Sequence, residues 1–234
     1  MIFAAILAGG IGTRMGNVEK PKQFLLLGNK PIIIHTIEKF FINHKFEEII
    51  VLCLNQWISY TEELISKYIP NSEKIKVIEG GKLRNDTIIN ATNYIETKHG
   101  LCDEDIIVTH DSVRPFITHR IIEENIKYTK EYGACDTVIP ATDTIAESKD
   151  NIFISNIPNR KNMYHGQTPQ SFRINKLKKL YNNISEEEKY SLTDACKIFS
   201  MNNEEVFIVE GEVTNLKITF PYDLKVANSI LKGE

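Results

Sequence analysis

The 234-residue chain has 42% hydrophobic and 25% charged residues, which is typical of a globular protein of one large or two small domains. Its net charge of −3 argues against a polyanion-binding surface and so against a nucleic-acid partner. No apolar run approaches the roughly 18 residues of a membrane span, and no cleavable leader is recognisable, so we expect a cytoplasmic protein without a membrane partner. The cysteines form no C-x-x-C pair, which argues against zinc; they are Cys53, Cys102, Cys135 and Cys196.

Apolar, β-branched segments alternate with segments of helical periodicity through the first 140 residues. Strands are predicted at 2–8, 48–54, 75–78, 105–109 and 137–140. Helices are predicted between them, at 31–43, 57–68, 85–97 and 118–132. This alternation predicts an α/β fold with a mainly parallel, twisted sheet and helices on both faces. Ligands of such sheets bind beyond the carboxyl ends of the strands, so the loops after the strands form the candidate site.

The regular alternation ends after residue 141. Extended pieces at 144–146 and 152–157 flank a polar turn at 149–151, and this pattern predicts a β-hairpin that projects as an arm over about 142–166. The remaining elements are predicted as helices at 175–182 and 193–201, strands at 206–210 and 215–219, and a helix at 221–231. Because repeats and flexible linkers are absent from the sequence, we expect a single domain over 1–234.

The loop after the first strand is rich in glycine. Residues 9–16 read GGIGTRMG, and Arg14 and Lys22 add two cations beside the glycines. Consecutive glycine amides form an anion-binding concavity, so a nucleoside triphosphate is the expected ligand. The loop lacks the Gly-Lys-Ser/Thr of a P-loop, and Met15 stands where the dinucleotide fingerprint needs a glycine. The alternative is a tight turn that binds nothing.

Other loops contribute charged side chains. Arg84, in the glycine-containing loop 79–87, is either a nucleotide contact or a surface cation. Asp111 leaves a buried strand, where it would bind Mg²⁺ beside phosphates, cap a turn or pair with Arg114. Lys217 points either into the site or to solvent. Several cations, one acid and no nucleophile–base pair indicate direct phosphoryl-type transfer.

Six groups of motifs run in order along the chain. They are LAGGIGTRMG with PKQF at 7–24, EGGKLRNDTI at 79–88, THDSVRPF at 109–116, GQTPQSF at 166–172, LTDACKIF at 192–199, and NLKIT with PYDLKVA at 215–227. Together they resemble the cytidylyltransferases that join CTP to a polyol phosphate. The resemblance implies a Rossmann-like fold, a Mg²⁺-dependent nucleotidyltransferase and a homodimer clasped by the β-arm.

The resemblance also implies roles for individual residues. Arg14 and Lys22 would stabilise the transition state at the α-phosphate, and Asp111 would hold the metal ion. Lys217 and Arg160 would orient the polyol phosphate, with Arg160 lent by the partner subunit. CTP would be bound by Leu7, Ala8, Gly9, Gly10, Gly81, Lys82, Leu83, Arg84, Asn85, Asp86, Thr87 and Ser112.

Two branches of this family differ in their polyol phosphate. Enzymes acting on 2-C-methyl-D-erythritol 4-phosphate usually carry basic residues where this chain has Thr142 and Glu147, and they usually read Asp-Ala-Ala at 111–113, where this chain reads Asp-Ser-Val. These departures favour ribitol 5-phosphate, whose product CDP-ribitol would feed teichoic-acid or related cell-surface polymer synthesis. The methylerythritol enzyme is the first alternative, and a non-catalytic nucleotide-binding subunit is the second alternative.

Overall fold

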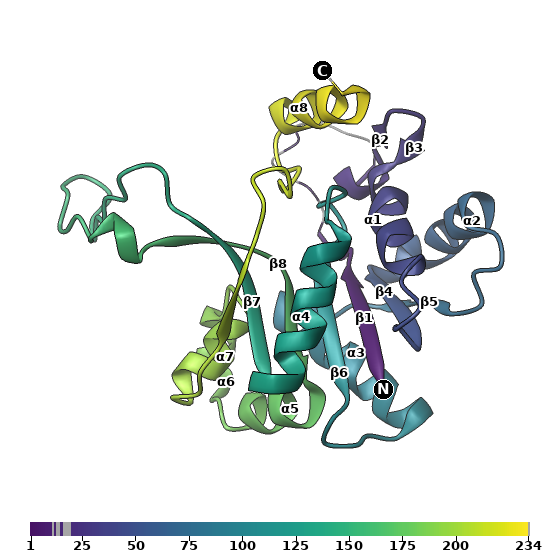
Figure 1. Cartoon of the computed structure of the whole chain (residues 1–234), viewed down its shortest axis with the longest axis horizontal. Coiled ribbons are helices and arrows are strands. Elements are labelled where there is room, and N and C mark those ends of the chain that lie inside the picture. Colours follow the sequence, from purple (N-terminus) through teal and green to yellow (C-terminus); the bar gives the residue numbers. More distant parts are fainter. Residues whose placement is uncertain (11, 13–14, 16–19, 234) are drawn as a thin grey trace.

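A seven-stranded sheet organises the computed structural model, which describes residues 1–10, 12, 15 and 20–233 (Figure 1). The strand order is β5–β4–β1–β6–β8–β7–β9. The strands are β1 (Ile2–Leu7), β4 (Glu48–Cys53), β5 (Ile75–Glu79), β6 (Ile106–Asp111), β7 (Ala134–Pro140), β8 (Tyr164–Arg173) and β9 (Phe207–Glu210). All pairings within the sheet are parallel except those of β8, which runs antiparallel to β6 and β7. The predicted mainly parallel α/β sheet is confirmed.

Helices cover both faces of the sheet because successive strand residues face opposite sides. Ala4 and Ile6 pack in one apolar cluster, whereas Phe3 and Ala5 pack in the other. The first cluster includes α1 (Ile32–Phe41), α2 (Ile58–Tyr68) and α4 (His119–Tyr132). The second includes α3 (Arg84–His99), α5 (Ile174–Asn182) and α7 (Cys196–Met201). In the described part of the chain, no helix combines the length and apolar character needed to cross a bilayer.

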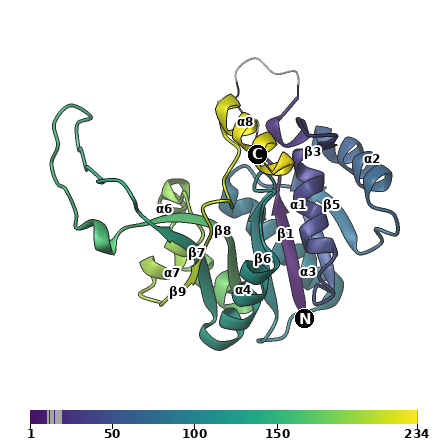
Figure 2. The same cartoon turned by 45° about the horizontal axis from the view of Figure 1, so that its top comes forward.

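Small elements close the carboxyl edge of the sheet. The ribbon of β2 (Leu26–Leu27) and β3 (Lys30–Pro31) lies next to α8 (Pro221–Lys232), as both views show (Figure 2). A third apolar cluster joins them, formed by Leu27, Ile32, Val113, Ile218 and Ala227. The remaining short helices are η2 (Lys22–Phe24), η3 (Asn55–Trp57), η4 (Arg160–Asn162) and α6 (Glu186–Ser191). The C-terminal helix therefore holds the preceding segment over the ends of the central strands.

The secondary structure of the second half differs from the prediction in three places. No strand is predicted over β8, because its polar residues lack apolar alternation, although the residues 167–172 are buried. The segment 215–219 is predicted as a strand but is irregular, since contacts with loops replace a strand ladder. One such contact is the bond from Ile218 N to Val113 O, at 2.9 Å. Helix α6 is also absent from the predictions.

The predicted arm is present, and the β-pairing of its predicted hairpin is limited to one antiparallel β-bridge. The arm leaves the sheet at Ala141 and returns at Met163, and both views show it projecting away from the sheet. Its two sides pair only through one β-bridge, between Glu147 and Asn156. The apolar side chain of Phe153 is 73% exposed, so the arm buries no face that would stabilise a two-stranded sheet.

Candidate active site

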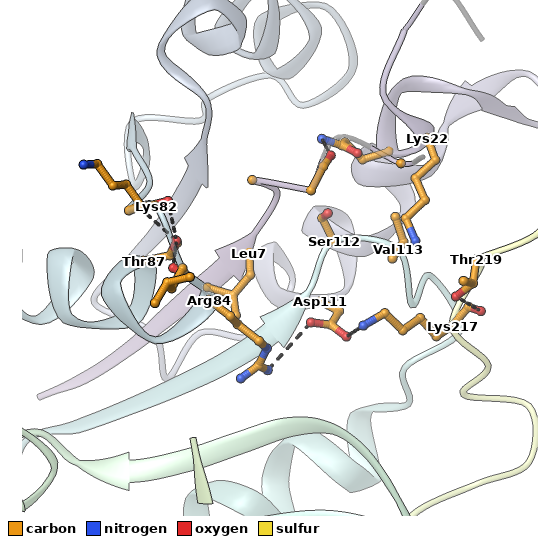
Figure 3. A pocket seen from close by; sticks show the side chains of 16 residues that line it. Leu7, Lys22, Lys82, Arg84, Thr87, Asp111, Ser112, Val113, Lys217 and Thr219 are labelled. Carbon is orange, nitrogen blue, oxygen red and sulfur yellow. Dashed lines mark hydrogen bonds and ion pairs between the residues drawn. The ribbon is translucent and has the colours of Figure 1, made fainter. Parts of the chain in front are cut away.

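A cavity of about 380 Å³ lies at the carboxyl ends of β1, β5 and β6 (Figure 3). This is the sheet edge at which ligands of doubly wound folds bind. Its predicted lining residues are Leu7, Gly9, Gly10, Lys22, Gly81, Lys82, Leu83, Arg84, Thr87, Asp111, Ser112 and Lys217, and its others are Gly12, Gln23, Val113 and Thr219. Tertiary structure thus gathers five separate sequence segments around one space.

The side chain of Gln23 anchors the loop after β1, although Gln23 is not among the predicted site residues. Its side-chain nitrogen donates to the carbonyl of Ala8 at 2.7 Å and to that of Gly10 at 3.1 Å. Gly12 has a φ of +75°, a left-handed conformation that favours glycine. Ala8 is 1% exposed and does not line the cavity, so it shapes the loop from behind. Arg14 lies outside the described residues.

The loop after β5 packs tightly on the first turn of α3. A Cβ atom on Gly81 would lie 2.3 Å from the Cβ of Asp86, so only glycine fits there. The Asp86 carboxylate accepts a hydrogen bond from Leu83 N at 3.1 Å. Asp86 and the buried Asn85 do not line the cavity. Asp86 supports the loop, whereas Lys82, Leu83, Arg84 and Thr87 face the open space.

Asp111 lies among three cations at the end of β6. Its carboxylate is 2.8 Å from Lys217 Nζ, 3.7 Å from Arg84 Nη2 and 3.7 Å from Arg114 Nε. Lys217 and Arg84 approach it from opposite sides (Figure 3). Burial by itself would raise the pKa of Asp111, but these positive charges outweigh burial and hold the pKa well below its ordinary value. Asp111 is therefore ionised at neutral pH.

The donor chemistry of the cavity fits a magnesium ion that arrives with a triphosphate. Magnesium in phosphoryl-transfer sites takes one or two carboxylates together with phosphate oxygens and water. Asp111 offers one ionised carboxylate at the cavity wall. Its pairing with Arg114, the alternative from the sequence, also occurs.

A neutral histidine fixes the backbone that carries Asp111. Burial lowers the pKa of His110 to about 4, so its ring is uncharged at neutral pH. Its Nε2 donates to the carbonyl of Arg114 at 3.1 Å, and its Nδ1 accepts from the Thr168 hydroxyl at 2.9 Å. The same hydroxyl accepts from Asp111 N at 3.1 Å. His110 therefore acts as a structural hydrogen-bonding residue.

The described lining is strongly cationic. Its charged residues are four bases, Lys22, Lys82, Arg84 and Lys217, and one acid, Asp111. Lys22 is 8% exposed, and its ammonium group donates to the carbonyl of Ile218 at 3.0 Å. A net positive, partly enclosed cavity attracts polyphosphates and stabilises charge on a transferring phosphoryl group.

Arg160 does not reach this cavity within its own chain. It lies in η4 on the arm, is exposed, and donates from Nη1 to the carbonyl of Thr142 at 2.8 Å. Arg160 and Thr142 both belong to the arm, and neither lines the cavity.

A second group of donor atoms was not found from the sequence. Oxygen and sulfur atoms of Asp136, Asp194 and Cys196 lie within 4.8 Å of one another, close enough to hold a metal ion. Gln170 Nε2 donates to Asp136 at 3.0 Å and to Asp194 at 2.7 Å. Burial and the charge of Asp194 raise the pKa of Asp136 to about 7. The sequence offered no signal, because Asp136 lies far along the chain from Asp194 and Cys196 and the three match no metal-ligand spacing.

A glycine-rich loop and a cationic cavity with one ionised carboxylate, at the edge of a Rossmann-like sheet, define a nucleotidyltransferase site. The model of the family "IspD: 2-C-methyl-D-erythritol 4-phosphate cytidylyltransferase" matches residues 2–233, and the chain belongs to this family. The protein is accordingly an enzyme, a CTP-utilising cytidylyltransferase.

Solved structures agree with this assignment. The crystal structure of 2-C-methyl-D-erythritol 4-phosphate cytidylyltransferase from Francisella tularensis has a TM-score of 0.80 at 29% identity and covers 97% of this chain and 98% of its own. The 4-diphosphocytidyl-2C-methyl-D-erythritol synthase of Anaerococcus prevotii has a TM-score of 0.79 at 26% identity, with coverages of 99% and 96%. These likenesses confirm the Rossmann-like fold. They favour the methylerythritol branch over the predicted ribitol branch.

Proposed function

We propose that this enzyme transfers CMP from CTP to 2-C-methyl-D-erythritol 4-phosphate and releases pyrophosphate. The carrying observation is the cationic cavity lined by Lys22, Arg84 and Lys217, in which Arg84 and Lys217 pair with the ionised Asp111. The polyol phosphate is inferred from the family model over residues 2–233 and from the names of the similar structures. We further propose that residues 1–234 act as one nucleotidyltransferase domain.

The proposed reaction is a direct displacement. A phosphate oxygen of the polyol phosphate forms a bond to the α-phosphorus of CTP, while the bond from that phosphorus to the bridging oxygen breaks and pyrophosphate leaves. Lys22 and Arg14 offset the charge that develops on the α-phosphate, and Lys217 orients the attacking phosphate. Mg²⁺ held by Asp111 and phosphate oxygens would neutralise charge on the triphosphate and its leaving group.

The nucleotide is proposed to bind along the two glycine-containing loops. Gly9 and Gly10 would let the phosphates come close to their backbone amides, since a Cβ added at either position meets no protein atom within 4 Å and the space there is open to a ligand. The other proposed contacts from the predicted set are Leu7, Gly81, Lys82, Leu83, Arg84, Thr87 and Ser112, all of which line the cavity.

A homodimer is proposed to complete the polyol-phosphate site. Arg160 lies on the arm, which projects away from the sheet (Figure 1), and it does not line the chain's own cavity, so its proposed role requires a second copy. The arm also presents exposed apolar side chains, at Ile152, Phe153, Ile154 and Ile157, which a partner subunit would cover.

Ribitol 5-phosphate is the second candidate substrate. It is favoured by the uncharged Thr142 and the acidic Glu147 on the arm, where the methylerythritol enzymes usually carry bases. Glu147 pairs with Asn156 in the arm's β-bridge, and the Asn156 side chain donates to its carboxylate. This carboxylate therefore lies on the arm, which is the part of the chain that would approach the partner's substrate.

One assay separates the candidates. Pyrophosphate release is measured with CTP and either polyol phosphate, at matched concentrations and with Mg²⁺ present. We expect the higher kcat/KM with 2-C-methyl-D-erythritol 4-phosphate. A higher value with ribitol 5-phosphate would reverse the order of the candidates, and no turnover with either would refute transfer to both polyol phosphates.

A further inference from the structure

The segment that carries Lys217 has no regular secondary structure. Residues 211–219 form neither helix nor strand, although Lys217 must be placed accurately to stay 2.8 Å from Asp111. A long, partly exposed lysine loses conformational freedom when it is held in one position. Because no strand pairing holds this segment, other contacts must keep it in place.

Asn215 provides one such attachment, beside the bond from Ile218 N to Val113 O at 2.9 Å. It is 0% exposed, and its side-chain nitrogen donates to Gln167 Oε1 at 3.1 Å and to the carbonyl of Thr168 at 2.9 Å. Both acceptors belong to β8. Its own carbonyl accepts a hydrogen bond from Arg114 Nη1 at 2.8 Å. One residue thus ties the segment to a strand of the sheet and to the loop that follows Asp111.

Gln167 holds the start of the same segment. Its side-chain nitrogen donates to the carbonyl of Glu212 at 2.8 Å, while its oxygen accepts from Asn215. Gly211 packs directly on this amide, because a Cβ there would lie 2.4 Å from Gln167 Oε1. The two amide side chains therefore clamp the segment on both sides of its turn at 213–214.

We propose that Asn215, together with Gln167, is a positioning residue that holds Lys217 in the catalytic cavity. Neither amide residue lines the cavity, so the effect on the reaction passes through Lys217. Small displacements of a catalytic group cost far more rate than they cost folding energy. The inference rests on the role of Lys217 in the proposed function.

A double-mutant cycle on the purified full chain tests this inference. Asn215→Ala should lower kcat by about 10- to 100-fold with little change in CTP affinity measured by calorimetry. The double variant Asn215→Ala/Lys217→Ala should be no slower than Lys217→Ala alone, because the positioned group is already missing. Gln167→Ala gives the same comparison if Asn215→Ala fails to fold.

Asn125→Ala is the matched control, since Asn125 is also 0% exposed and donates to Ile121 O and Thr137 Oγ1 away from the segment. It should lower the melting temperature while leaving kcat near wild type. The positioning role would be overturned if the fold-decreases in kcat of the two single variants multiplied in the Asn215/Lys217 double variant. A wild-type kcat in Asn215→Ala would overturn it as well. Wild-type activity of Lys217→Ala would instead refute the proposed role of Lys217 itself.

Discussion

The ammonium group of Lys217 lies 2.8 Å from the carboxylate of Asp111, so the C-terminal segment completes a site built largely from the first half of the chain. Asp111 ends a central strand, whereas Lys217 lies in an irregular segment clamped to β8. The same carboxylate also pairs with Arg84 from the loop after β5. The contact therefore links the proposed metal ligand to cations from two separate loops.

Lys217→Ala should lower kcat by about 100-fold, because it removes a cation from the reacting phosphate. The measurement is steady-state pyrophosphate release. The control is Lys225→Ala, which removes an exposed lysine on α8 outside the cavity and should leave kcat unchanged. Equal rates for both variants would contradict a direct role of Lys217.

Lys22→Ala and Arg14→Ala should each lower kcat strongly while the fold, checked by circular dichroism, stays intact. The reason is that each removes charge stabilisation proposed for the transition state at the α-phosphate. Lys39→Ala, at an exposed position of α1, serves as the control. Wild-type turnover in either test variant would remove that residue from the proposed mechanism.

Arg160→Ala should raise the KM for the polyol phosphate and leave the KM for CTP unchanged. If Arg160 acts on the partner's site, then mixing Arg160→Ala with Lys217→Ala subunits should regenerate about a quarter of wild-type activity, since half the dimers are mixed and each holds one intact site. Subunits are mixed under conditions that allow exchange. No recovery, despite mixed dimers detected by mass spectrometry, would place Arg160 in its own subunit's site or outside catalysis.

Two glycines should respond differently to alanine. Gly81→Ala forces a Cβ to within 2.3 Å of Asp86, so the melting temperature should fall. At Gly10 a Cβ meets nothing within 4 Å, so Gly10→Ala should keep its melting temperature but bind CTP more weakly. Thermal unfolding and calorimetric titration with CTP measure the two effects. Unchanged CTP affinity in Gly10→Ala would argue against close packing of CTP on Gly10.

Asp136→Asn should stabilise the protein in a pH-dependent way. Burial and the charge of Asp194 raise the pKa of Asp136 to about 7, so the folded state binds this proton more tightly than the unfolded state does. The stability gained from the raised pKa is full below the ordinary value of 3.8 and is lost as pH rises towards 7. The melting-temperature advantage of the variant should therefore grow between about pH 4 and pH 7. A constant difference across this range would contradict the raised pKa.

The sequence by itself determined the parallel core and most of the cavity wall. Strands such as β4 are buried along their whole length, so their unbroken apolar runs are visible without a structure. Parallel strands place their carboxyl ends at one edge, so loops as distant as those at Gly10 and Arg84 could be assigned to one site.

Tertiary structure alone decided the features that depend on distant partners. The polar strand β8 is stable only because β6 and β7 pair with it on both sides, and its periodicity gives no sign of this. Asp86 has the residue type of a nucleotide contact, yet its carboxylate bonds to Leu83 N in the loop and it does not line the cavity. Lys217 is directed inward by the amides of Asn215 and Gln167, which lie far apart in sequence. Such side-chain bonds between distant segments follow no local period, so only the folded chain reveals them.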